Sequence, residues 1–416
     1  MSSDIEVHVD FADGLKRVGT LYRHLRRSGE STSFDYHPEW LADSAQFFLE
    51  PALALTRGAF SPPGGQCIFG SLGDSAPDTW GRRLMQRAER RLAQREGRAP
   101  RTLSEADYLL GVADISRLGA LRFRRVGEHG FQAPATAGVP RLVELGRLLQ
   151  VTERILRDQE TDEDLLMILA PGSSLGGARP KASVIDPQGR LAIAKFPRET
   201  DAYSVELWES VAMDLATKAG IETPEHQLRQ ISGKPVLLSR RFDRRGGTRV
   251  PFLSALSMMG LADGARGSYP ELVDLLTQYG AQARGDAKTL FRRMAFNVLI
   301  SNVDDHLRNH GFLWQGRAGW TLSPAYDLNP TPVDVRPRIL TTNISLDEGT
   351  CDVELVLSSA EYFGQSKATA RAVVKSVAEA TRTWRDVAKA AGARVREIDR
   401  MASAFEHDDL NRALKL

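Results

Sequence analysis

Apolar residues near the start of the chain follow the pattern of β-strands. In IEVHVDF, residues 5–11, every second position is apolar, as in a strand with one buried face. VGTLY, residues 18–22, is rich in residue types that favour strands. Turn-forming residues separate these runs, so the first hundred or so residues are expected to be rich in β-structure.

The apolar spacing changes to that of helices in the second half of the chain. TLFRRMAFNVLI, residues 289–300, has apolar positions three and four residues apart. The same spacing returns in residues 368–384 and 393–405. Between the two regions, EHGFQAPATAGVP (128–140) lacks a period and contains Gly and Pro, which indicates a linker and a boundary near residue 130.

Composition indicates an ordinary globular protein. The 416 residues, 42% hydrophobic and 26% charged, suit two or three packed units. The N-terminus lacks a basic segment followed by an apolar one, and no uncharged apolar run approaches the length of a membrane span, so we expect a cytoplasmic protein with no membrane partner. Cys67 and Cys351 stand apart without a CxxC pattern, which argues against a disulfide framework or structural zinc.

The net charge of +2 hides an uneven distribution. Residues 80–101, WGRRLMQRAERRLAQREGRAPR, hold eight arginines against two glutamates. We interpret this segment as a solvated helix with Leu84, Ala88 and Leu92 toward the core. A surface for nucleic acid or a partner is the alternative.

A glycine-rich stretch precedes the central strands. PGSSLGGARPKASVI, residues 171–185, offers backbone N–H groups, hydroxyls and basic side chains that suit a phosphate. It is not a Walker A loop, because Ala178 stands where the lysine would be although Gly172 and Gly177 have the right separation. By itself the stretch is better explained as a glycine-rich hairpin turn than as a phosphate-binding loop.

One lysine interrupts the apolar run that follows. LAIAKF, residues 191–196, reads as a strand containing Lys195. A lysine there either extends its amine to solvent at the strand end or faces an anion. Protein kinases combine a glycine-rich loop with a strand lysine to hold ATP phosphates. On the next predicted helix, Glu206 and Glu209 are candidate partners for the lysine.

Polar residues gather where the helix ending near residue 300 gives way to an apolar strand. In ISNVDDHLRNHGFLW, residues 300–314, four residues separate Asp304 from Asn309. Kinase catalytic loops have this D-x-x-x-x-N interval between a hydroxyl-orienting aspartate and a magnesium-binding asparagine. Further along, GWTLSPAYDLNP places Asp327 after a strand-like run, in the position of a second magnesium ligand.

The same carboxylates permit a competing interpretation. Asp304, Asp305, His306 and Asp327 are also candidate ligands of a metal hydrolase. That interpretation leaves the glycine-rich loop and Lys195 without a role, and no second histidine cluster completes the ligand set.

Taken in order, the motifs resemble the HipA family of toxin kinases, which are serine/threonine-protein kinases of type II toxin–antitoxin systems. The resemblance rests on GGARPKASV, AKFP, SRRFDR, NVDDHLRNHGF and SPAYDL, and in the early part of the chain on GTLY, FDYHPEWL, DTWGRRL and RLGALRF. It therefore covers nearly the whole chain.

The resemblance implies an α+β fold of the atypical protein-kinase-like, two-lobed kind, with an N-terminal β-rich subdomain and an all-helical C-terminal lobe. Residues 1–130 would form the β-rich subdomain. Residues 131–250 would form the ATP-binding part of the kinase core, and residues 251–416 a mostly helical lobe with the catalytic loop.

The resemblance also implies roles for individual residues. Asp304 would be the catalytic aspartate, His306 would support its loop, and Asn309 and Asp327 would hold Mg²⁺. The ATP site would be formed by Lys195, Gly176, Gly177, Ala178, Arg240, Phe242 and Glu209. Ser174 would be the autophosphorylated residue, with Ser173 as the alternative register. Asp305 stands where glycine is common in the family.

The implied partners are a HipB-like helix-turn-helix antitoxin, operator DNA contacted through that antitoxin, and a protein substrate. Family members phosphorylate aminoacyl-tRNA synthetases and cause growth arrest and persistence. Two other functions stay open: a kinase of a small molecule or lipid, because DDHLRN also resembles the loop of phosphoinositide kinases, and a catalytically silent co-repressor.

Overall fold

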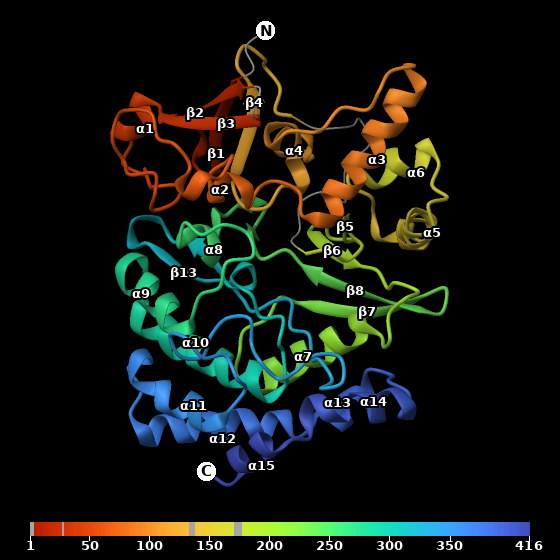
Figure 1. The fold of residues 1–416 in the computed structure, drawn as a ribbon, viewed down its shortest axis with the longest axis vertical. Coiled ribbons are helices and arrows are strands. Elements are labelled where there is room, and N and C mark those ends of the chain that lie inside the picture. The colour runs from red at the N-terminus through yellow and green to blue at the C-terminus, as the bar shows by residue number, and fades with distance from the viewer. Residues whose placement is uncertain (1–3, 27–28, 133–137, 170–176) are drawn as a thin grey trace. The chain divides into compact units, whose positions relative to one another are not determined.

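The computed structural model describes residues 4–26, 29–132, 138–169 and 177–416 (Figure 1). The chain forms two compact units. The first comprises residues 1–198 and 230–263, and the second comprises residues 199–229 and 264–416. The first unit thus joins the predicted β-rich segment to most of the predicted ATP-binding segment.

The strands of the first unit are β1 (Ile5–Phe11), β2 (Gly14–Arg26), β3 (Gly29–Tyr36), β4 (Leu121–Arg125), β5 (Lys181–Ile185), β6 (Leu191–Lys195), β8 (Lys234–Arg240), β9 (Arg244–Arg245), β10 (Thr248–Arg249) and β11 (Phe252–Ser254). Its helices are α1 (Pro38–Ala42), α2 (Gly70–Gly73), α3 (Thr79–Arg95), α4 (Glu105–Gly111), α5 (Leu145–Leu156), α6 (Asp162–Leu169) and α8 (Ala255–Met258). The unit boundary crosses β7 (His226–Ile231).

The predicted N-terminal strands form an antiparallel sheet of order β3-β2-β1-β4. Ile5, Val7 and Val9 of β1 are fully buried, as their alternation predicts. The intervening Glu6 and His8 are buried as well. They bind each other at 3.2 Å, and Glu6 also pairs with Arg17 and Arg124. Their charges therefore have partners on the face that alternation alone would expose to solvent.

A second antiparallel sheet of the first unit contains the candidate lysine, Lys195. Strands β5, β6 and β8 are antiparallel, and Lys195 at the end of β6 lies between Lys181 of β5 and Leu237 of β8. Alternate residues of this sheet enter one apolar core with α3, α5 and α6; its buried members are Trp80, Leu84, Leu145, Leu148, Leu149, Val151, Ile155, Ile168, Ala182, Val184, Ala192, Ala194, Phe196, Val236 and Leu238.

The arginine-rich segment is helical over Thr79–Arg95, beginning at the N-cap Asp78, whose Oδ1 accepts from Gly81 N. Leu84 faces the core as predicted, but the prediction for Leu92 is wrong, because Leu92 is 37% exposed and Ala93 is buried instead. Many of the arginines bind acidic groups; the pairs are Arg82–Glu105, Arg87–Asp158, Arg87–Glu160, Arg95–Asp162, Arg98–Glu89 and Arg101–Asp107. Most of these arginines are therefore neutralised by carboxylates of the first unit. This favours the solvated-helix interpretation over a surface for nucleic acid.

The second unit is mostly helical. Its elements are α7 (Val205–Lys218), α9 (Tyr269–Tyr279), α10 (Ala283–Leu299), β12 (Gly311–Trp314), β13 (Trp320–Leu322), α11 (Val353–Ser358), α12 (Lys367–Thr381), α13 (Trp384–Ala390), α14 (Val395–Phe405) and α15 (Asp408–Leu414). Helix α10 packs against α9 and α12 (Figure 1). The α+β prediction is confirmed. The hairpin β12–β13 contains the two strands that the sequence predicted around residues 312 and 321, within the lobe that the resemblance implied to be helical. Among the described residues, no helix has both the length and the apolar character needed to cross a bilayer.

Candidate active site

The candidate catalytic loop begins where α10 ends. Ser301 has a φ of 54°, in the left-handed region that stops a helix and turns the chain. Its hydroxyl donates to the Ala404 carbonyl at 2.8 Å and accepts from Arg338 Nε at 3.0 Å. The first residue of the loop is therefore fixed from two other parts of the second unit.

The adjacent aspartates Asp304 and Asp305 have opposite environments. The Asp304 side chain is 55% exposed, and its Oδ1 accepts from Arg336 Nη1 at 2.8 Å. Asp305 is 2% exposed. The loop thus presents one carboxylate to solvent and buries its neighbour.

The buried carboxylate binds two side chains. The Tyr269 hydroxyl donates to Asp305 Oδ2, and His310 Nε2 lies 3.2 Å from Oδ1 at ion-pair distance, though not aligned as a hydrogen bond. Burial raises the pKa of the Asp305 carboxyl, but His310 and Tyr269 outweigh burial and hold this pKa below its usual value. Burial and the nearby carboxylate raise the pKa of Tyr269 well above its usual value, so Tyr269 remains a hydrogen-bond donor.

Replacing this donor tests the stability of the loop. Tyr269→Phe should lower the free energy of unfolding by about 1–3 kcal/mol, because a buried carboxylate oxygen loses its partner. Urea unfolding would measure the change. Tyr362→Phe is the matched control, since Tyr362 is 55% exposed and should shift the free energy by no more than about 0.5 kcal/mol. Equal unfolding midpoints for the two variants would contradict the prediction.

A chain of amides continues from Tyr269 to Asp327. Asn297 Nδ2 donates to the Tyr269 hydroxyl at 2.9 Å, and Asn297 Oδ1 accepts from Asn302 Nδ2 at 3.1 Å. Asn302 Oδ1 accepts from the Asn329 backbone N–H, and Asn329 Nδ2 donates to Asp327 Oδ1 at 3.2 Å. The buried side of the catalytic loop is therefore connected to the loop that carries the predicted second metal ligand.

The two predicted metal ligands lie on neighbouring loops. Asn309 Nδ2 donates to the Asp304 carbonyl at 3.2 Å across the predicted four-residue gap. The Tyr326 hydroxyl donates to the Arg308 carbonyl at 2.7 Å, so the residues that precede Asp327 and Asn309 are joined directly. An amide oxygen and a carboxylate are hard donors that suit Mg²⁺ while leaving positions for water and phosphate. This donor set fits the metal that the resemblance implies.

His306 and Asp327 have special local geometry. The backbone N–H of His306 donates to the Asp304 carbonyl at 2.8 Å, and its carbonyl accepts from Asn309 N at 2.8 Å. Its Nδ1 is buried without a hydrogen-bond partner among the described residues. Asp327 has a φ of 58°, a left-handed conformation that aspartate tolerates better than most residues.

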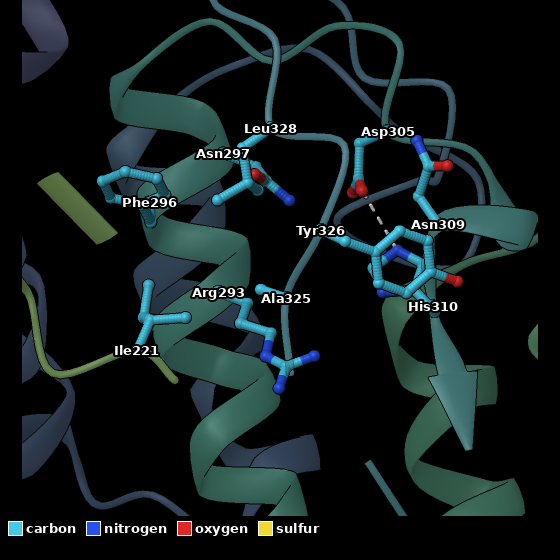
Figure 2. A pocket seen from close by; sticks show the side chains of 10 residues that line it. All are labelled: Ile221, Arg293, Phe296, Asn297, Asp305, Asn309, His310, Ala325, Tyr326 and Leu328. Carbon is cyan, nitrogen blue, oxygen red and sulfur yellow. Dashed lines mark ion pairs between the residues drawn. The ribbon is translucent and has the colours of Figure 1, made fainter. Parts of the chain in front are cut away.

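A small cavity lies behind the loop (Figure 2). Figure 2 shows Asp305, Asn309 and His310 on one side of it and Arg293 and Asn297 of α10 on the other. Its volume is about 10 Å³, on the order of the space that one water molecule needs. The cavity is therefore a polar gap inside the second unit and is far too small for a nucleotide.

The predicted phosphate-binding residues lie in the first unit. Lys195 is half-buried at the end of β6. Gly177 has a φ of 91°, and an added Cβ would come within 3.2 Å of Lys181 Nζ, so this position requires glycine. Lys181 itself is 3% exposed and bound to Asp78 Oδ2 at 2.8 Å.

The other residues predicted for the ATP site and for autophosphorylation lie in one of the two units or outside the described residues. Ala178 is exposed in the first unit, and Glu209 is buried on α7 in the second. Ser173, Ser174 and Gly176 lie outside the described residues.

The motif SRRFDR contains a buried ion cluster that the sequence did not predict. Asp243 is fully buried and accepts from Arg241 Nε at 2.6 Å, Arg244 Nη1 at 2.6 Å and the Gly119 backbone at 2.7 Å. Arg241 also donates to the carbonyls of Ser116 and Arg117. The cluster therefore ties the end of β8 to the segment before β4.

The residues predicted beside adenine flank this cluster. Arg240 pairs with Ala192 in the ladder between β8 and β6. The ring of Phe242 packs on Phe252 at 6.2 Å between centroids.

Two candidate ligands of the metal-hydrolase interpretation bind side chains of the protein. Asp305 binds Tyr269 and His310, whereas Asp304 binds Arg336 in an exposed pair. In the part of the chain that the structure describes, no group of three or more His, Cys, Asp or Glu residues is arranged to hold a metal ion.

Comparisons with known proteins agree with the family that the motifs resemble. A family model described as the HipA-like C-terminal domain matches residues 173–394. A relative from Sinorhizobium fredii named "Putative kinase Y4mE" is 26% identical over 40% of this chain and 44% of its own length. A "Putative kinase" from Haemophilus influenzae is 24% identical over 38% of this chain and 52% of its own length. The chain thus matches about half the length of these relatives.

The fold is similar to that of a solved toxin. HipA of a toxin–antitoxin system from Shewanella oneidensis MR-1, in a complex with HipB and its operator DNA, superposes with a TM-score of 0.69 at 18% identity. The match covers 99% of this chain and 96% of that one. At this identity the likeness establishes the fold.

Proposed function

Because the chain belongs to the HipA-like C-terminal domain family, whose model covers more than half of it, we propose that it is a toxin kinase that transfers the γ-phosphate of ATP to a serine or threonine of a protein. The observation that carries this proposal is the loop from Asp304 to Asn309. The loop exposes one carboxylate, buries the next, and connects through hydrogen bonds to the segment of Asp327.

Asp304 orients the acceptor hydroxyl. An exposed carboxylate on a fixed backbone can accept the hydroxyl proton and aim the oxygen at phosphorus. The His306 backbone N–H and the Asn309 side-chain amide both donate to the Asp304 carbonyl and hold the peptide in place. Positioning of this kind supplies a large part of the rate enhancement in phosphoryl transfer.

Asn309 and Asp327 would hold Mg²⁺. When bound, Mg²⁺ neutralises charge on the β- and γ-phosphates. Asn309 contributes an amide oxygen and Asp327 a carboxylate, and the contact between Tyr326 and Arg308 keeps their loops adjacent.

The nucleotide side would use residues of the first unit. Lys195 would pair with the phosphates, and Gly177 and Ala178 would give the backbone close access to them. The left-handed φ of 91° at Gly177 favours glycine, as close backbone access at this position would require. Gly176 would share the role of Gly177, and main-chain groups near Arg240 and Phe242 would bind the adenine edge.

Regulation would follow the pattern of the family. Autophosphorylation of Ser174 would place about two negative charges beside the basic stretch that ends at Lys181. A HipB-like helix-turn-helix antitoxin would neutralise the toxin and connect it to operator DNA. The complex in which the Shewanella HipA was solved supports this partner.

The test is incubation of the purified chain with ATP labelled at the γ-phosphate, with bacterial extract as the source of acceptor, followed by gel imaging and peptide mass analysis. We expect label on serine or threonine of the chain and of an extract protein. Omitting Mg²⁺ with a chelator present should abolish both signals, because Asn309 and Asp327 would then hold no ion against the phosphates.

The outcomes separate the functions left open. Label that appears in a small molecule or lipid and on no protein would replace the protein-kinase proposal. Failure to bind Mg-ATP in calorimetry would point to a co-repressor that acts only with its antitoxin.

A further inference from the structure

The segment that follows the Asp327 loop exposes apolar side chains beside Asp304. Val333, Val335 and Ile339 are 50%, 46% and 46% exposed. These three are among the large hydrophobic side chains that the described part of the chain leaves open to water. Because exposed apolar surface is costly to solvate, three such side chains within seven residues offer apolar area that a partner could cover.

The backbone of this segment is held firmly. Thr331 N donates to the Ser301 carbonyl at 3.1 Å, and Thr341 N donates to the Val303 carbonyl at 3.2 Å. Between them, Val333 N donates to Ser403 Oγ at 3.2 Å. The segment is thus bonded at both ends to the candidate catalytic loop.

A partly buried arginine adds a further anchor. Arg338 Nη1 binds Asp409 Oδ2 at 2.5 Å, and its Nη2 donates to the Val298 carbonyl at 3.0 Å. Pro332 and Pro337 restrict the chain on both sides of Arg336. The exposed side chains therefore project from a fixed support and do not collapse onto the protein.

Arg336 connects the segment to the reaction centre. Its Nη1 lies 2.8 Å from Asp304 Oδ1, and the two side chains are 58% and 55% exposed. An acceptor hydroxyl that binds at Oδ1 of Asp304 competes with this contact. When this contact is lost, the Arg336 guanidinium has no carboxylate partner from the same segment, because the neighbouring Asp334 already binds Arg400 at 2.6 Å. An acidic side chain on the acceptor segment would then pair with Arg336 in place of Asp304.

On the basis of the proposed kinase function, we propose that residues 333–339 form the docking surface for the protein substrate. The occupant is an extended segment with an acceptor serine or threonine, aliphatic side chains that pack on Val333, Val335 and Ile339, and an acidic residue that pairs with Arg336. In the absence of substrate, Arg336 caps Asp304 and so disfavours transfer to water.

The test uses an oriented library of serine peptides that varies aliphatic and acidic residues around the acceptor. Wild type should select Val or Ile together with Asp or Glu. The variant V333T/V335T/I339T keeps the branched shape but removes apolar contact, so KM for the selected peptide should rise at least about tenfold with a smaller change in kcat. Arg336→Gln should lose the preference for acidic residues and increase hydrolysis of ATP by water.

Val395→Thr is the matched control, because Val395 is 72% exposed on α14 and should leave KM unchanged. An unchanged KM in the triple variant, or retained acidic preference in Arg336→Gln, would overturn the docking proposal while leaving the kinase proposal intact. A wild-type chain that phosphorylates neither peptide nor protein would overturn both proposals. A shift in thermal midpoint of the triple variant is not expected, since the replaced side chains are exposed.

Discussion

Replacing Asp304 with alanine should reduce phosphoryl transfer from ATP by about 10²- to 10⁴-fold, as expected for loss of a residue that orients and deprotonates the acceptor. The fold should survive. The Asp304 carboxylate is 55% exposed and its bond to Arg336 joins two exposed side chains, so its loss costs at most about 1 kcal/mol. The backbone carbonyl that accepts from His306 and Asn309 is unchanged.

The measurement is the rate of label transfer with saturating ATP, together with the thermal midpoint of each protein. Asp399→Ala is the matched control, because Asp399 is also exposed and paired with an arginine, Arg385, at 3.5 Å. The control should retain wild-type activity. A folded Asp304→Ala protein with undiminished transfer would remove Asp304 from the mechanism.

The spacing of motifs is enough to select the residues proposed to act in catalysis, but it does not reveal the side chains that support them. The four-residue interval between Asp304 and Asn309, and the position of Asp327 after a strand, can be read from a linear sequence because each lies within one short segment. The hydrogen-bond chain that runs from Asp305 to Asp327 could not be read in this way, since its members come from separate elements; they are Tyr269, Asn297, Asn302 and Asn329.

The exposure of Asp304 and the burial of Asp305 could not be predicted from the sequence either. Adjacent loop residues have no periodicity that assigns one to the core. The resemblance implied only that Asp305 stands where glycine is common in the family, and gave this residue no role. Its burial against Tyr269 and His310 now gives it a structural role.

In the first unit, periodicity predicted the apolar faces and missed the buried charges. Ile5, Val7 and Val9 were recognisable from alternation, whereas Glu6 is buried because arginines from β2 and β4 reach it. The prediction that Leu92 enters the core was wrong for a related reason. Helical spacing shows which face of a helix is apolar, but it does not show how far along the helix neighbouring elements cover that face. Tertiary partners decide burial at such positions.

The largest stability effect is expected at Asp243. Its carboxylate is 0% exposed and faces the guanidinium groups of Arg241 and Arg244, which are 2% and 12% exposed. Burial raises the pKa of Asp243, but the two arginines outweigh burial and bring this pKa to about 2. Asp243→Asn would leave both cations without their anion in a dry environment, which should lower the free energy of unfolding by about 3–5 kcal/mol.

Denaturant unfolding of the wild type and of Asp243→Asn at several pH values would test this expectation. Because the folded pKa is depressed, the contribution of Asp243 is fully present above the unfolded value of about 4 and is lost as the pH falls toward the folded value. The variant should therefore lose stability at neutral pH and show a weaker decline below pH 4. The control is Asp13→Asn, since Asp13 is 67% exposed and lies 3.4 Å from Lys16, a surface pair worth at most about 1 kcal/mol. If both variants unfolded at the same denaturant concentration, the cluster around Asp243 would not be what joins β8 to the segment before β4.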